Sequence, residues 1–543
     1  MEKTATVTED ASQAAPSGGP KASTVAFLTV ALCLGIFCVS LDVTIIATAI
    51  PRITDQFGSL EDVGWYGSSY LLTNCATTLA FGKLYTYYST KSVYLSALGL
   101  FEIGSAVCGA TPTSLGLILG RCLAGLGGGG LFSGSLLIIT QVVPLHRRPI
   151  FTALLGGMFG IASVIGPLDS LGGAFTDHVS WRWCFYINLP IGAITAIFVF
   201  FLFDAPKPAQ ARPNLRDLLG KLDPIGTILF LPAIVCLLLA LQWGGNQYAW
   251  GNYRIIVLFA VSGALLVAFL GCQIWSGDNA TLPPRIMRNR NIWSSAWFAL
   301  TLNGAYMVFI YYLPIWFQAV KSASATKSGI MIIPIVLAVV IVSILSGAAV
   351  TAFGYYNPLM ILAPLVLVVG AGLLTTLEPN SGSAKWIGYQ ILVGTGAGLG
   401  QQLPFMVVQT VLPIGDVPIG TAVLTFCQTL GGAIFISVAQ TVFTNKLTSN
   451  LRAQNPSVNV TDVPGVGGAS LPSKFSGDQL GSVLQSYSSA VTHTFYVGVA
   501  LAALTVFGTV ALEWKCVKNK DKPSVVHGEN RDSDCMSLRE RNF

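Results

Sequence analysis

Charged residues are scarce in this sequence, and their scarcity sets its class. Only 10% of the 543 residues are Asp, Glu, Lys or Arg, while 53% are hydrophobic. An ordinary soluble domain carries about 25% charged residues, so a water-soluble globular protein is excluded. The composition predicts a polytopic membrane protein instead.

Signatures of metal and nucleotide binding are also missing. The eleven cysteines include no CxxC pair and the four histidines are scattered, so neither a metal site nor a disulfide framework is predicted. The sequence has no G-x-x-x-x-G-K-[ST] loop, which disfavours an ATP-driven pump. The net charge of +6 indicates no nucleic-acid partner, because most basic residues lie at the ends of apolar stretches. We therefore expect no cofactor and no enzymatic activity.

Fourteen apolar stretches are each long enough to cross roughly 30 Å of hydrocarbon as a helix. The ten-residue alternation of membrane barrel strands is absent, so the predicted fold class is an all-α membrane protein with fourteen transmembrane helices. The predicted spans are 24–49, 63–81, 92–111, 115–141, 150–175, 184–203, 224–243, 255–275, 293–318, 328–351, 358–376, 386–408, 420–444 and 491–514.

The predicted organisation is two bundles of six helices joined by two linker helices. The polar, proline-containing segment 204–223 follows the sixth span and marks the boundary. The predicted parts are a disordered cytoplasmic tail at 1–23, an N-terminal bundle at 24–203, a cytoplasmic loop at 204–223, two linker helices at 224–275, a cytoplasmic loop at 276–292, a C-terminal bundle at 293–514 with an outer loop at 445–490, and a cytoplasmic tail at 515–543.

The distribution of basic residues predicts the orientation. With the N-terminus inside, the short inner loops hold eleven Lys and Arg residues and the short outer loops hold six. This excess favours a cytoplasmic location for both termini. The sequon at Asn459 then lies in the outer loop and is a predicted glycosylation site, whereas the sequon at Asn279 is cytoplasmic and should remain unmodified.

Arg121 is the one charged residue in the apolar stretch from Leu115 to Thr140. Burying a charge there costs at least about 2.5–3.5 kcal/mol, so we expect Arg121 to face a polar cavity or a carboxylate. The alternative is that its long side chain reaches the membrane surface. Six glycines follow it and predict close packing of neighbouring helices: Gly125, Gly127, Gly128, Gly129, Gly130 and Gly134.

Asp42 and Glu102 are the acids that we predict to take part in proton coupling with Arg121. Asp42 and Arg121 lie at matching depths in the outer halves of their spans, and Glu102 lies near the middle of the third. A carboxylate in a low-dielectric setting can gain and lose a proton as access alternates. Two alternatives stay open, namely that Asp42 is a helix-end charge solvated from outside and that Glu102 is the buried partner of a hydroxyl or backbone group.

The second half of the chain offers amides and aromatic rings in place of charges. Between Trp293 and Phe443 the spans contain almost no ionisable residues. Aromatic faces with a few amides suit a small amphipathic organic molecule. The predicted substrate cavity comprises Asn303, Tyr306, Gln401, Gln402 and Gln428.

Five motifs in the first half give the sequence a family resemblance. They are Leu41-Asp42-Val43-Thr44 with Pro51, the inner-loop residues Gly82, Lys83 and Lys91, Arg121 with Gly125 and Gly127, the glycine-proline set Gly160, Gly166, Pro167, Gly172 and Gly173, and the run from Trp181 to Gly192. In this order they resemble the major facilitator superfamily, and in particular its fungal fourteen-span drug:proton antiporters. The resemblance implies proton coupling through Arg121, an antiporter motif in the fifth span and an inner-loop gate at Gly82, Lys83 and Lys91.

The sequence departs from the family pattern in two places. The inner-loop motif has Thr86 and Ser89 where the family usually has an aspartate and a second glycine, so Lys83 and Lys91 lack their usual local acid. Asp169 and Ser170 separate the two parts of the antiporter motif. Two extra helical residues rotate the rest of the helix by about 200°, unless a bulge absorbs them.

These observations predict proton-coupled efflux of small amphipathic compounds across the plasma membrane. By the resemblance, the cargo is a mycotoxin, a secondary metabolite or an antifungal drug. The expected partners are a small-molecule substrate, protons and the lipid bilayer, with no nucleic acid and no obligate protein partner. One alternative keeps the fold and carries siderophores or basic amino acids, with a vacuolar location. Another is a solute sensor that transports nothing.

Overall fold

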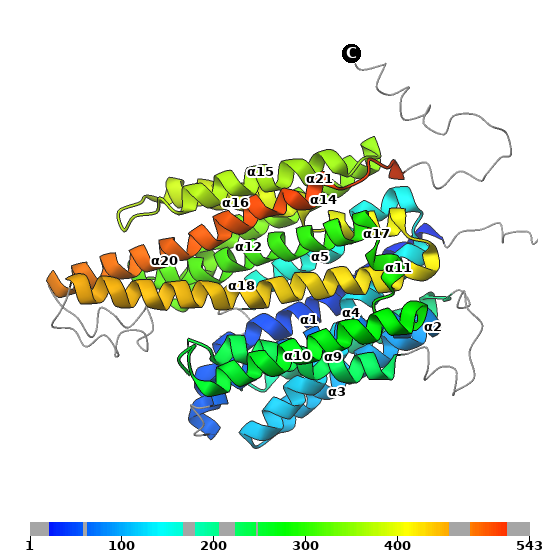
Figure 1. The fold of residues 1–543 in the computed structure, drawn as a ribbon, viewed down its shortest axis with the longest axis horizontal. Coiled ribbons are helices and arrows are strands. Elements are labelled where there is room, and N and C mark those ends of the chain that lie inside the picture. The colour runs from blue at the N-terminus through cyan, green and yellow to red at the C-terminus, as the bar shows by residue number, and fades with distance from the viewer. Residues whose placement is uncertain are drawn as a thin grey trace, which may run out of the picture.

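The structure is a computed structural model, and it describes residues 21–57, 62–166, 180–205, 223–245, 248–454 and 478–517. Within these ranges the chain is helical, and its one β feature is an isolated bridge between Gly244 and Tyr248. Long helices run nearly parallel across the molecule (Figure 1). The prediction of an all-helical membrane protein is confirmed.

We call helices α1 to α7 the N-terminal half. Their bounds are α1 Ala22–Phe57, α2 Val63–Tyr87, α3 Thr90–Ala110, α4 Ser114–Val142, α5 Arg148–Ile165, α6 Trp183–Tyr186 and α7 Asn188–Leu202, with a short 3-10 helix, η2, at Leu145–Arg147. The helix α4 packs against α2 and α3, and α1 packs against α5 and α7.

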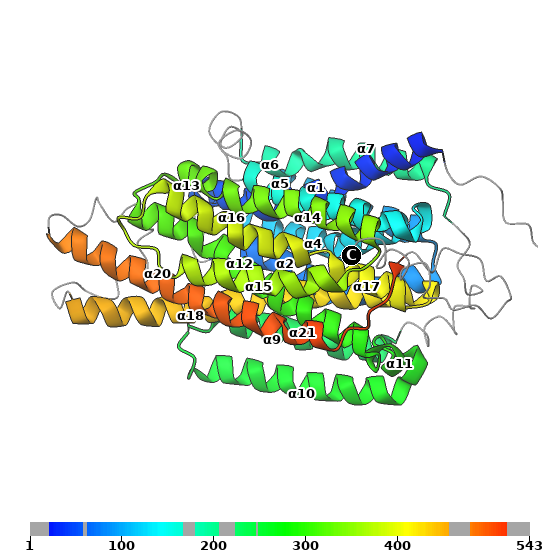
Figure 2. The same cartoon turned by 90° about the horizontal axis from the view of Figure 1, so that it is seen from above.

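The linker consists of α9, Pro224–Trp243, and α10, Tyr253–Ser276, followed by the short helices η5, Gly277–Asn279, and α11, Pro284–Met287. In the 18-residue apolar stretch of the span that contains α10 only 17% is buried, whereas 78% is buried in the corresponding stretch of α4. The apolar surface of α10 therefore faces lipid, and α10 lies at the edge of the molecule (Figure 2). Its neighbour α9 connects it to α2 and α18.

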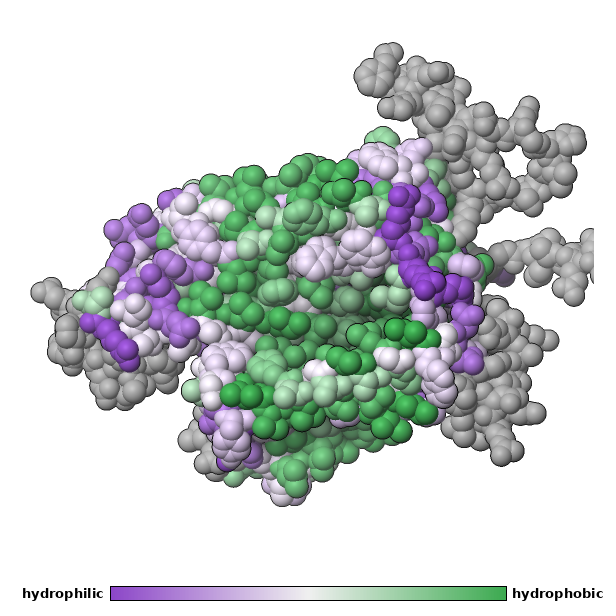
Figure 3. Space-filling view, in the orientation of Figure 1, coloured by the Kyte–Doolittle hydropathy of each residue, from purple (hydrophilic) through white to green (hydrophobic). Residues whose placement is uncertain are grey.

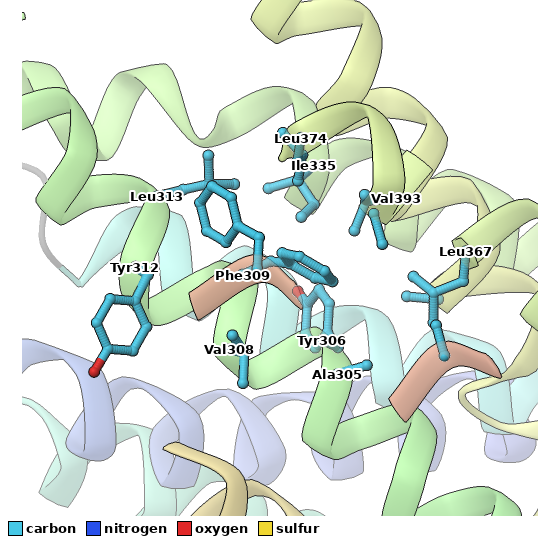
Figure 4. Packing of buried hydrophobic residues seen from close by; sticks show 14 of the residues in the cluster. Ala305, Tyr306, Val308, Phe309, Tyr312, Leu313, Ile335, Leu367, Leu374 and Val393 are labelled. Carbon is cyan, nitrogen blue, oxygen red and sulfur yellow. The ribbon is translucent and has the colours of Figure 1, made fainter. Parts of the chain in front are cut away.

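We call the remaining helices the C-terminal half. Their bounds are α12 Arg290–Val320, α13 Ala325–Met331, α14 Ile333–Phe353, α15 Asn357–Leu374, α16 Ser383–Gly400, α17 Leu403–Val411, η6 Ile414–Asp416, α18 Val417–Gln454, α20 Asp478–Thr505 and α21 Phe507–Val510. The central helix α12 packs on α18 and α20. Its aromatic residues form a cluster with side chains such as Leu367 and Val393 (Figure 4).

Helices lie at all the predicted spans. Twelve helical segments of the described residues are long and apolar enough to cross a membrane, and α2 and α5 are not among them. The helix α2 carries many hydroxyl groups, several of which bond to its own preceding turn, as Thr78 does to the carbonyl of Asn74 at 2.7 Å.

The molecular surface shows a broad hydrophobic belt between two hydrophilic ends (Figure 3). The predicted division into domains stays a prediction.

The two halves contact each other along α5 and α14, and also between α2 and α18 near one end of the molecule. We call this the terminal end, because α1 begins there and α21 ends there (Figure 1). A Cβ on Gly82 of α2 would lie 2.6 Å from Cβ of Ala422 in α18. Phe132 and Phe405 meet at a centroid distance of 5.7 Å. Glycine at position 82 thus lets the two helices approach closely.

Candidate functional site

Arg121 lies in the interior of the N-terminal half, with 1% of its side chain exposed. It forms an ion pair with Asp42 of α1. Its Nε donates to the carbonyl of Tyr66 at 2.9 Å and its Nη1 to the carbonyl of Asp42 at 3.2 Å. The guanidinium also stacks over the Tyr70 ring at 4.6 Å from the centroid. The alternative in which Arg121 reaches the membrane surface is therefore wrong.

Asp42 is fully buried, with 0% of its side chain exposed. One carboxylate oxygen pairs with Arg121, and the other accepts a longer hydrogen bond of 3.4 Å from Nδ2 of Asn188. The same Nδ2 donates to Ser105 at 3.2 Å. Asp42 is therefore a paired interior charge, and not a helix-end charge in solvent. The predicted meeting of Asp42 and Arg121 occurs in the structure.

Glu102 lies outside this ion pair, on the interface between α3 and α7. Both of its carboxylate oxygens are buried and have no hydrogen-bond partner among the described residues. A Cβ on Gly192 would lie 1.7 Å from Oε1 of Glu102, so only glycine at 192 leaves room for the carboxyl group. A buried ionised carboxylate without a partner is costly, so Glu102 is suited to carry a proton. Its predicted role in coupling stays a prediction.

Asn188 is a residue of this site to which the sequence reasoning gave no role. It lies within the tryptophan-rich run and begins α7, where it is completely buried between Asp42 and Ser105. An amide inside an apolar span needs partners, and that requirement was the available signal. Its particular partners depend on how α7 is rotated against α1 and α3.

The glycines of α4 bring α4 into backbone contact with two helices. A Cβ on Gly125 would lie 2.4 Å from the carbonyl oxygen of Tyr70 in α2, and one on Gly127 would lie 2.4 Å from that of Ala97 in α3. The predicted close packing by small residues is confirmed. It also holds Arg121 beside α2, which supplies Tyr66 and Tyr70.

The antiporter motif is only partly within the described residues. Gly160 faces Val336 and Val340 of α14, so it lies between the two halves. Gly166 lies against Thr44 of α1, whose hydroxyl donates to the carbonyl of Ala162 at 3.2 Å. Pro167, Gly172, Gly173 and the inserted pair Asp169 and Ser170 lie outside the described residues, as does Asn459.

The inner-loop residues lie at the terminal end. Lys83 is 1% exposed, and its Nζ donates to the carbonyl of Asn279 in the linker at 3.1 Å. Lys91 lies over the ring of Phe200 at 5.1 Å. A linker carbonyl thus contacts Lys83 where the family usually places a local acid.

Three of the predicted cavity residues form a connected group in the C-terminal half. Asn303 donates to the carbonyl of Gln428 at 2.7 Å, Gln401 donates to Oδ1 of Asn303 at 3.1 Å, and Gln428 donates to the carbonyl of Gln401 at 3.1 Å. Oε1 of Gln401 is left buried without a partner among the described residues. This group can therefore accept a hydrogen bond from a bound molecule.

Gln402 and Tyr306 lie apart from that group. Gln402 packs against Gly156 of α5, where a Cβ would lie 1.8 Å from Nε2, so it contacts the opposite half. Tyr306 is 4% exposed and belongs to the hydrophobic cluster around α12 (Figure 4). Packing accounts for Tyr306 in this conformation, and its place in a substrate cavity stays a prediction. Among the described residues no group of three His, Cys, Asp or Glu side chains is arranged to hold a metal ion.

Comparison with known proteins identifies the family. Residues 32–436 match the Major Facilitator Superfamily. The chain belongs to this superfamily. This major facilitator protein is 70% identical over 495 residues to the efflux pump roqT of Penicillium rubens, covering 91% of this chain and 92% of the relative. It is 55% identical over 501 residues to the MFS-type transporter astH of Aspergillus oryzae, covering 92% and 88%.

Solved structures agree on the fold. The human organic anion transporter MFSD10 matches with a TM-score of 0.56 at 14% identity, covering 88% of this chain and 99% of that one. The proton:xylose symporter XylE matches with a TM-score of 0.57 at 12% identity, covering 89% and 94%. This major facilitator protein is therefore a multi-pass membrane protein with the transporter fold of its superfamily.

Proposed function

We propose that this protein exports small amphipathic organic compounds in exchange for protons. The observation that carries the proposal is the buried ion pair of Asp42 and Arg121 in the interior of the N-terminal half. An intramembrane pair of this kind is expensive to keep and typical of proton relays. Protonation of Asp42 would release Arg121 to its other partners. The driving force is then the proton gradient, with no cofactor.

The amide group of the C-terminal half supports an uncharged or weakly polar cargo. Asn303, Gln401 and Gln428 supply donors and acceptors without net charge. The candidate cargo classes are a mycotoxin, another secondary metabolite or an antifungal drug, in keeping with relatives named efflux pumps. A carrier of siderophores or basic amino acids is the second candidate, but cationic cargo would call for carboxylates beside these amides. A sensor that moves nothing is the candidate of another class.

The proposed location is the plasma membrane, with both termini in the cytoplasm. The terminal end then faces the cytoplasm, and the contacts between the halves close this side. The vacuolar membrane is the alternative location. No obligate protein partner is proposed. The chain forms buried hydrophobic clusters of its own, one of which extends from the N-terminal half through the linker into α17 and α18.

The proposal is tested with purified protein in vesicles that have an imposed proton gradient. A panel of fluorescent compounds, some neutral and some cationic, is added outside vesicles with an acidic lumen. Accumulation of the neutral compounds that collapses with a protonophore supports proton-coupled efflux. Accumulation of cationic amino acids alone supports the second candidate. Binding of a compound without any movement supports the sensor.

A further inference from the structure

Asp223 organises the part of the linker that lies at the terminal end. This residue precedes α9 and has a left-handed backbone with φ of 51°. Its carboxylate accepts from the backbone N–H of Gly226 at 2.8 Å, from Gln273 at 2.7 Å, and from both N–H and hydroxyl of Thr281 at 2.8 and 2.9 Å. Asp223 therefore ties the start of α9 to the end of α10 and to the loop beyond it.

The loop that follows α10 is held by hydrogen bonds and by two consecutive prolines. Gln273 accepts from the backbone N–H of Leu282 at 2.7 Å, which fixes the loop as far as Leu282. Pro283 and Pro284 come next, and proline fixes the backbone dihedral φ. We call residues 279–285 the strap. Little flexible chain remains between Asn279 at one end of it and Arg285 at the other.

The strap contacts both halves of the transporter. At one end the carbonyl of Asn279 accepts from Lys83 of α2 at 3.1 Å. At the other end the guanidinium of Arg285 forms two hydrogen bonds, of 2.6 and 3.0 Å, with the carboxylate of Asp416 just before α18. The helices α2 and α18 meet next to the contact of Lys83, because Gly82, the residue before Lys83, lies against Ala422. The strap thus spans the seam between the halves.

We propose that the strap is a latch that holds the terminal end closed, and that Arg285 and Asp416 form the clasp that opens when the halves separate. The inference rests on the proposed export function, which requires the terminal end to open so that substrate can enter from the cytoplasm. Lys83 is 1% exposed, whereas the Arg285 side chain is 56% exposed. Water can replace the partner of an exposed ion pair at little cost, while stripping a buried ammonium of its acceptor is expensive. The clasp therefore opens before the contact of Lys83 does.

The test measures how often the seam opens. In the reporter variant Ile419→Cys, a cysteine stands on α18 beside Gly82, and a membrane-impermeant maleimide applied from the terminal end labels it when the seam parts. Adding Arg285→Gln should raise the labelling rate about 1.4- to fivefold, the range that corresponds to the loss of one exposed ion pair. Reversing the pair with Arg285→Asp and Asp416→Arg should return the rate toward that of the reporter alone.

Two controls make the result specific. Arg290→Gln breaks an exposed ion pair with Glu513 that lies within the C-terminal half, and it should leave labelling unchanged. The protein with native Ile419 reports labelling of its other cysteines. A labelling rate in Arg285→Gln equal to that of the reporter alone would overturn the latch, and so would an equal rise in Arg290→Gln.

Transport measurements separate this inference from the proposed function. A short bifunctional maleimide joining Arg285→Cys to Asp416→Cys should stop transport, whereas either single variant treated in the same way should remain active. If the unlinked double variant transports and linking it changes nothing, the latch is wrong and the proposed function stands. If the wild-type protein moves no compound under a proton gradient, the proposed function fails.

Discussion

Asp42 and Arg121 form an ion pair in the interior of the N-terminal half, and at most 1% of either side chain is exposed. They come from α1 and α4, so the pair forms only when these helices pack together. Tyr66 and Asn188 supply further hydrogen bonds to the two partners. The pair therefore depends on correct folding, and the proposed proton coupling requires that it be broken during transport.

Arg121→Ala should destabilise the protein more than Arg121→Lys. Arg121→Ala leaves Asp42 buried without its counter-ion and should destabilise the protein by about 3–5 kcal/mol. Arg121→Lys keeps the charge but loses the planar guanidinium that reaches both Asp42 and the carbonyl of Tyr66. Thermal unfolding in detergent should rank the variants as wild type, Lys and then Ala. Arg254→Ala removes an exposed arginine and serves as the control; a loss of stability in it as large as in Arg121→Ala would contradict the account.

The glycines of α4 provide a matched pair for a packing test. Gly127→Ala places a Cβ 2.4 Å from the carbonyl oxygen of Ala97 and should cost about 1–3 kcal/mol. Gly99→Ala, on α3, meets nothing within 4 Å and should be neutral or stabilising by up to about 1 kcal/mol. Unfolding midpoints of the two variants measure the difference. Equal midpoints would show that α3 and α4 are not tightly packed at Gly127.

The sequence alone predicted what depends on composition and depth. Asp42 and Arg121 could be paired because charges at matching depth in apolar spans need each other. The partners of Asn188 and Lys83 could not be predicted, because they depend on the rotation of α7 and the docking of the linker loop. The role of Tyr306 was ambiguous, because a tyrosine in an apolar helix has the same sequence signal whether it lines a cavity or packs in a hydrophobic cluster.

Asp223 should make the stability of the linker depend on pH. Burial alone would raise the pKa of this carboxyl, but the hydrogen bonds from Gln273, Thr281 and Gly226 outweigh burial and lower the pKa below its usual value. The ionised group therefore stabilises the fold fully above about pH 4, and this contribution is lost as the pH falls through the folded-state pKa. Asp223→Ala should lower the unfolding midpoint at pH 7 and approach wild type near pH 3.

The control for Asp223 is Asp278→Ala. This aspartate is 79% exposed and contacts only the strap residue Arg285, at 3.4 Å, among the ion pairs of the described residues. Its variant should unfold like wild type at both pH values. A gap between Asp223→Ala and wild type that stays constant from pH 7 to pH 3 would show that the charge of Asp223 is not what stabilises the loop.

Topology can be tested by tags and by glycans. Tags at Met1 and Phe543 should bind antibody only after the membrane is permeabilised. A mobility shift on glycosidase treatment should disappear in Asn459→Gln and persist in Asn279→Gln. A glycan on Asn279 would place the terminal end outside the cytoplasm, and staining of either tag on intact cells would do the same.

The most direct test of the account is proton-driven transport by Asp42→Asn in vesicles, with Glu102→Gln measured beside it. Asparagine imitates protonated Asp42, so the variant should still bind a fluorescent substrate but should no longer accumulate it in response to a proton gradient. The comparison uses equal amounts of folded protein, because an unpaired Arg121 can hinder folding. Accumulation that follows the gradient in well-folded Asp42→Asn would contradict the account, and its loss in Glu102→Gln would then make Glu102 the coupling acid.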